Sequence, residues 1–149
     1  GFRPLYGVTA SGARLEERMA QVDIAPIPGR VGQQIRNELI FTSNGTGAGD
    51  GPRAYLLEVA IRESTTSTLV KSSGESLSQV YSLEAYFRLV SVKDKRIVLQ
   101  GVSHGRAGFE RFESIFSNVR ASHDAENRAA RFVASDLKTR IAAFLSGNS

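Results

Sequence analysis

Two stretches of this chain alternate apolar and polar residues, which is the pattern of a strand with one buried face. In residues 54–63 the apolar side chains fall on every second position, at Tyr55, Leu57, Val59 and Ile61. The same spacing recurs in the second stretch, at Tyr81, Leu83, Ala85, Phe87 and Leu89. Successive side chains of a strand point to opposite faces. These stretches therefore predict a sheet that must bury one face against another layer.

Two segments with helical spacing predict that covering layer. Pro28 and Gly29 precede a stripe of apolar residues at four-residue intervals, Val31, Ile35 and Leu39, and Asn44-Gly45 is a good helix stop. A longer segment, from about residue 122 to 145, carries a second stripe: Ala125, Ala129, Phe132, Val133, Leu137, Ile141, Phe144 and Leu145. Both segments predict helices with one apolar side.

Two further strands complete the expected fold. Residues 19–24 predict a short strand before the first helix, and residues 97–109 predict the last strand, in which Gly101, Gly105 and Gly108 suggest bulges or bends. The order is β-α-β-β-β-α. We predict an α+β fold, a two-layer α/β sandwich with two helices on one face of a four-stranded mixed sheet. The first strand is expected beside the second, although a different position of the first strand in the sheet is an open alternative.

The chain has 149 residues, the usual length of one domain. Residues 1–18 have no clear period and predict an N-terminal tether, which leaves residues 19–149 as a single α/β sandwich domain. Residues 45–51 form a glycine-rich loop. Its spacing is not G-x-G-x-x-G and it follows a helix, so we assign it no phosphate-binding role.

The positive charge is unevenly placed. The formal net charge is +4; residues 1–75 carry eight basic and eight acidic groups, whereas residues 76–149 carry eleven basic and seven acidic groups. Such a bias favours an anionic partner such as a phosphorylated sugar, although a solvated surface without a ligand is an equal alternative.

Catalytic patterns are weak. The chain has no cysteine and no G-x-S-x-G sequence, and its two histidines, His104 and His123, do not form an H-x-x-x-H pair. No RNP-like pattern favours nucleic acid. We therefore predict a protein that is not an enzyme, that holds no metal or cofactor, and that binds no nucleic acid.

Several short segments resemble one protein family. Residues 1–7 read GFRPLYG, which is similar to the segment directly after the lipidated cysteine of bacterial outer-membrane lipoproteins. Further matches follow in order along the chain: Ile35–Leu39, Tyr81-x-Leu83, Arg88–Val90, Ile97–Gly101 and Asp124–Ala130. Together they resemble the lipopolysaccharide-assembly lipoprotein family, LptE.

The resemblance implies a location and two partners. It implies an acylated cysteine just before Gly1, which would anchor the domain at the periplasmic face of the outer membrane. Family members plug the lumen of the LptD β-barrel translocon, bind lipopolysaccharide, and support its transport and outer-membrane assembly. The alternative from the residues themselves is a free-standing periplasmic module that binds an anionic ligand.

The resemblance also suggests where lipopolysaccharide would be bound. Its phosphates and acidic sugars favour basic contacts. The family places a basic residue between the second and third strands, where Lys71 stands, and Arg62 ends the preceding strand. Arg128 and Arg131 on the last helix are further candidates. For each of the four, a solvated surface cation is the alternative.

Overall fold

The computed structural model describes residues 15–44, 53–69, 77–111 and 114–147. Its elements run in the order β1 (Val22–Ile24), α2 (Gly29–Asn44), β2 (Tyr55–Leu69), β3 (Leu77–Ser91), β4 (Ile97–Glu110) and α3 (Ile115–Gly147). The strands form one sheet in the order β1-β2-β3-β4. β1 pairs with β2 in parallel, and the other two pairings are antiparallel. The predicted mixed sheet, with the first strand beside the second, is confirmed.

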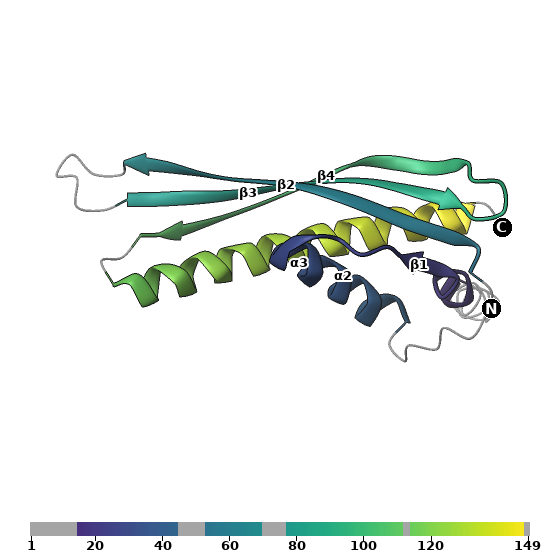
Figure 1. Ribbon diagram of the computed structural model, residues 1–149, viewed down its shortest axis with the longest axis horizontal. Helices are drawn as coiled ribbons and strands as arrows, with labels where there is room; N and C mark the ends of the chain where they lie inside the picture. Colours follow the sequence, from purple (N-terminus) through teal and green to yellow (C-terminus); the bar gives the residue numbers. More distant parts are fainter. Residues whose placement is uncertain (1–14, 45–52, 70–76, 112–113, 148–149) are drawn as a thin grey trace, which may run out of the picture.

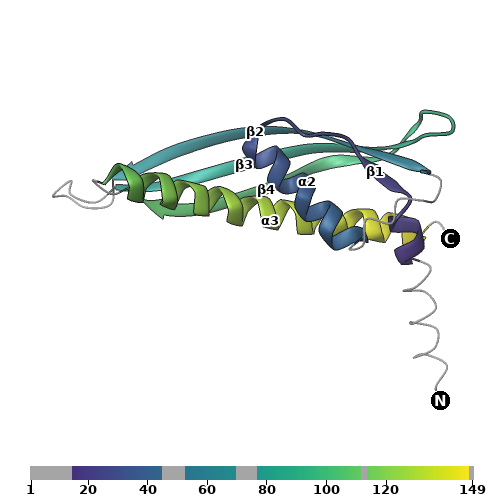
Figure 2. The same cartoon turned by 60° about the horizontal axis from the view of Figure 1, so that its bottom comes forward.

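Both helices lie on the same side of the sheet (Figures 1 and 2). α3 runs along the length of β3 and β4 and packs against both, and α2 packs against α3. Arg36 of α2 also donates from Nε to the carbonyl oxygen of Ile24, at 3.0 Å, which ties α2 to the end of β1. The predicted two-layer sandwich is therefore confirmed, and the opposite face of the sheet carries no helix in the described part of the chain.

The core lies between the helices and the sheet. The alternating residues of β2 and β3 supply its sheet side, with Leu57, Leu83 and Leu89 at most 1% exposed. The stripes of α2 and α3 supply the other side, with Ile35 and Leu137 fully buried. Burial of this apolar surface is the main force that holds the two layers together.

Gly105 of β4 serves close packing against α3, and the bulges predicted at the three glycines of β4 are wrong. Gly101, Gly105 and Gly108 pair regularly with β3; within the described strands the register shifts between Leu89 and Val90 instead. A Cβ atom at Gly105 would stand 2.8 Å from the carbonyl oxygen of Ala129 on α3. Because glycine lacks that atom, the backbone of α3 can approach the sheet.

Two predicted boundaries differ from the structure. α3 begins at Ile115, seven residues before the predicted start, because its first turns are not marked by a buried stripe: Ile115 and Phe116 are 74% and 80% exposed. Residues 15–19 are helical rather than tether or strand, and Met19 is buried in the core. Only Val22–Ile24 pairs with β2. The rest of the predicted tether, residues 1–14, and the glycine-rich loop lie outside the described residues.

Among the described helices, none combines the length and the apolar character that a membrane crossing requires.

Candidate functional site on the uncovered face of the sheet

The face of the sheet that carries no helix is polar over much of its described length. The residues that alternate with the core positions point to it and are partly or fully exposed: Glu58, Arg62, Ser64, Thr66, Ser82, Glu84, Tyr86, Arg88, Gln100, His104 and Arg106. Tyr86 is 43% exposed. Tyr86 and Arg88 thus lie opposite the core, as the alternation predicts. We call this surface the outer face.

The charged groups on one part of the outer face neutralise one another. Arg88 donates from Nε to Glu58 across the β2–β3 pairing, at 2.5 Å. Beside this ion pair, a shallow hollow crosses the three strands at Ala60, Tyr86 and Val102. An exposed ion pair of this kind adds little stability, typically 0–1 kcal/mol. It does cancel the charge of Arg88.

A second hollow on the outer face gathers positive charge that is only partly neutralised. The strand register places Arg62, Glu84 and His104 in one row across β2, β3 and β4. The next row contains Ser64, Ser82 and Arg106. These six side chains line a hollow of about 230 Å³, which we call the arginine hollow.

The one carboxylate in the arginine hollow already has partners. Glu84 accepts a hydrogen bond from the hydroxyl of Tyr86 at 3.1 Å, and its other oxygen lies 3.7 Å from Nδ1 of His104. The guanidinium groups of Arg62 and Arg106 make no hydrogen bond or ion pair with any residue in the described ranges. The hollow therefore presents two guanidinium groups against one carboxylate, a net charge of about +1 when His104 is neutral.

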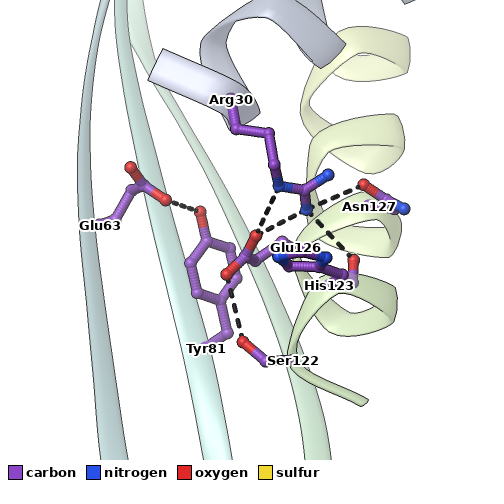
Figure 3. Close-up of polar contacts among 7 residues, drawn as sticks. All are labelled: Arg30, Glu63, Tyr81, Ser122, His123, Glu126 and Asn127. Atoms are coloured by element: carbon purple, nitrogen blue, oxygen red, sulfur yellow. Dashed lines mark hydrogen bonds and ion pairs between the residues drawn. The ribbon is translucent and has the colours of Figure 1, made fainter. Parts of the chain in front are cut away.

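A polar cluster on the other side of the sheet holds the helices in place (Figure 3). Arg30 of α2 reaches α3, where its Nη2 lies 2.6 Å from Oε1 of Glu126 and 3.3 Å from Oδ1 of Asn127. Ser122 donates to the other oxygen of Glu126 at 3.2 Å. In the same view, Tyr81 of β3 donates to Glu63 of β2 at 2.6 Å. Each of these groups is occupied by a neighbour, so the cluster is structural.

Tyr81 gives this cluster a pH dependence that can be measured. Burial raises the pKa of Tyr81 well above its usual value of about 10, and the hydrogen bond to Glu63 raises it further. A raised pKa in the folded state means that the stabilisation is present below about pH 10 and is lost as the pH rises above it.

We expect Tyr81→Phe to cost about 1 kcal/mol of unfolding free energy at pH 8, because Glu63 loses its hydrogen bond. Above about pH 10, the wild-type chain should lose up to about 1.4 kcal/mol per pH unit relative to the variant. Urea unfolding of both proteins at pH 8, 10 and 11 measures this difference. Parallel pH profiles would show that Tyr81 does not titrate differently in the folded state.

The four cations predicted to bind lipopolysaccharide do not converge. Arg62 lies in the arginine hollow on the outer face. Arg128 is on α3, where it pairs with Asp124 at 2.9 Å and donates to the carbonyl oxygen of Gly108 at 2.9 Å. Arg131 is exposed on α3. Lys71 lies outside the described residues. A site shared by the described three is therefore not formed within this chain.

Of the six side chains in the arginine hollow, only Arg62 was predicted as a ligand contact; Ser64, Ser82, Glu84, His104 and Arg106 were not. The alternation through residues 81–89 already placed Ser82 on the polar side, whereas Ser64 follows the stretch 54–63 in which alternation was predicted. The two serines lie next to Arg62 and Arg106 because of the register between the strands. That register depends on the turns, which a single strand's pattern does not specify. His104, which lies in the predicted last strand, is exposed on β4.

No family model and no curated protein matches this chain. Solved structures do match its fold. One is a candidate lipoprotein from Caulobacter crescentus, with a TM-score of 0.70 and 20% sequence identity; the match covers 91% of this chain and 98% of that one. Another is the rare lipoprotein B from Shewanella oneidensis, with a TM-score of 0.53 and 10% identity over 82% of this chain and 93% of that one. At these identities the similarity establishes a shared fold: this two-layer sandwich is one that bacterial lipoproteins also adopt.

Proposed function

We propose that this chain is the periplasmic domain of an outer-membrane lipoprotein that plugs the LptD β-barrel and binds lipopolysaccharide, so that it works by contact and not by catalysis. The observation that carries the proposal is the outer face, a polar sheet surface that the fold leaves uncovered in its described part. The fold shared with two lipoproteins supports the lipid-anchored part of the proposal.

The shape and the polarity of the domain suit a barrel lumen. α3 has 33 residues, which at 1.5 Å per residue is roughly 50 Å. The three long strands run beside it, so the body is an elongated rod (Figure 1). The interior of an outer-membrane barrel is polar, and the apolar band outside it is roughly 25 Å tall. A rod whose outer face is largely polar can face such a polar interior, because little of its apolar surface would be exposed there.

The cations of the described residues support binding of an anionic glycolipid. Arg62 and Arg106 offer guanidinium groups with no partner in the described part of the chain, and guanidinium groups match phosphate geometry well. Arg131 is exposed on α3, and the family resemblance assigns a contact to Lys71. The resemblance of residues 1–7 to a lipoprotein start supports an acyl anchor on a cysteine before Gly1.

Co-expression tests the proposal. The chain would be produced with a lipoprotein signal peptide and a cysteine before Gly1, together with an affinity-tagged LptD barrel from the same organism. We expect the chain to co-purify with the barrel from detergent-extracted outer membranes and to carry acyl chains by mass spectrometry. If the acylated chain reaches the outer membrane but does not co-purify with the barrel, the plug is wrong.

The arginine hollow also favours the second candidate, a free-standing periplasmic module that binds an anionic ligand. Such a module would bind its ligand without any barrel, and added salt would weaken that binding because exposed charges are screened. Binding of lipopolysaccharide by the isolated chain, combined with failure to co-purify with the barrel, would select this candidate.

A further inference from the structure

The arginine hollow combines three properties of an oxyanion site. Its two guanidinium groups come from different strands, β2 and β4, and approach the hollow from both sides of β3. Ser64 and Ser82 lie in the same row as Arg106, and their hydroxyl groups can donate hydrogen bonds, while Glu84 stands between Arg62 and His104 in the other row. His104 adds a further donor that becomes cationic when protonated. Donors from several directions suit a tetrahedral group better than a flat carboxylate.

The arrangement of charge distinguishes this hollow from the rest of the outer face. Arg88, two positions from Tyr86 on the same strand, is paired with Glu58. In the arginine hollow, Glu84 is engaged by Tyr86 and faces His104, and no described carboxylate bonds to either arginine. Two like charges at one hollow repel each other, and a bound dianion would relieve that repulsion.

The size of the hollow limits what it can hold. Its volume of about 230 Å³ is below the range of roughly 300–1,000 Å³ in which drug-sized ligands are enclosed. The hollow is therefore suited to one charged group of a larger ligand, with the remainder lying along the polar outer face.

We propose that Arg62, Arg106 and His104, with the hydroxyl groups of Ser64 and Ser82, form a binding site for a phosphate monoester. This inference deepens the proposed function and rests on it for the source of the phosphate, which is a phosphorylated glycolipid of the lipopolysaccharide class. Each phosphate oxygen would accept hydrogen bonds from a guanidinium or a hydroxyl group, and Glu84 would hold His104 in place beside them.

The test compares the full chain with two double variants of equal charge. The site variant is Arg62→Gln with Arg106→Gln. The control is Arg96→Gln with Arg120→Gln, which removes two exposed cations that lie outside the hollow, one between β3 and β4 and one on α3. Exposed substitutions of this kind change stability by about 0.5 kcal/mol or less, and circular dichroism melting would verify that both variants fold. Calorimetry then measures the binding of lipopolysaccharide and of the same lipopolysaccharide after enzymatic dephosphorylation.

We expect the site variant to bind phosphorylated lipopolysaccharide about tenfold more weakly or worse, because a hydrogen bond to a charged group contributes about 1.5–3 kcal/mol. The affinity of the control variant for phosphorylated lipopolysaccharide should fall less than about threefold, because exposed charges contribute little. The dephosphorylated glycolipid should bind both variants alike. Equal losses in the two variants, or an equal loss for the dephosphorylated glycolipid, would overturn the site.

Inorganic phosphate separates this inference from the proposed function. Nuclear magnetic resonance of the wild-type chain should show phosphate-dependent shifts at the backbone amides of Arg62, Glu84 and Arg106, and the site variant should not show them. If those shifts occur but lipopolysaccharide does not bind, the proposed function is wrong and the phosphate site stands. If lipopolysaccharide binds the site variant normally and phosphate causes no shifts, the site is wrong and the proposed function stands.

Discussion

Leu137→Ala is expected to lower the free energy of unfolding by about 2–5 kcal/mol. Leu137 is fully buried on α3, in the core that joins the helices to the sheet. Truncation of its isobutyl side chain to a methyl group loses apolar burial and leaves a cavity that the packed surroundings fill only in part. Urea unfolding followed by circular dichroism measures the change, with a constant slope indicating that only stability has changed.

A leucine on the outer face is the matched control for this change. Leu56 lies on β2, where it is partly exposed on the outer face near Val90, Val92 and Ile97. Leu56→Ala should cost clearly less than Leu137→Ala, because a partly exposed side chain has less burial to lose. If the two variants were equally destabilised, the core would not lie on the helical side of the sheet alone.

Gly105→Ala is expected to cost about 1–3 kcal/mol, although alanine is ordinarily the better strand residue. The added Cβ atom would stand 2.8 Å from the carbonyl oxygen of Ala129 and 3.1 Å from a methyl group of Val133. The first of these neighbours is helix backbone, so relief requires α3 to move away from the sheet. Thermal and urea unfolding of the variant measure the cost.

Gly108 supplies the control on the same strand. A Cβ atom at Gly108 would meet only the carbonyl oxygen of Gln79, at an ordinary 3.7 Å. Gly108→Ala should therefore leave stability unchanged within about 0.5 kcal/mol, or raise it slightly. If Gly105→Ala were as stable as Gly108→Ala, the close approach of α3 to β4 would not be a feature of the folded protein.

The sequence predicts the layers well because each layer has a strong period. The alternation through Tyr55–Ile61 and Tyr81–Leu89 reports a sheet with one buried face, and the stripe through Ala125–Leu145 reports the helix that covers it. The start of α3 was missed because Ile115 and Phe116 are exposed, so no buried stripe marks that end. The role of Gly105 was misread because a bulge and a close helix approach both select glycine, and only the packing distinguishes them.

The candidate site was predictable only in part. Arg62 was identified as a contact, but Arg106 joins it through pairing across three strands, and a register is fixed by turns and by the core. Arg128 was a reasonable candidate by charge alone. Its bonds to Asp124 and to the carbonyl oxygen of Gly108 exist only in the folded chain, and they occupy the guanidinium group.

Photocrosslinking in cells tests the central claim most directly. A photoreactive benzoylphenylalanine would replace Tyr86, 43% exposed on the outer face, or, in a second variant, Phe132, 59% exposed on α3. A domain seated inside a barrel is surrounded by its wall, so both variants of the acylated chain should crosslink to LptD. Crosslinks from neither position would contradict the plug, and crosslinks from one position alone would indicate a domain that rests against the barrel from outside.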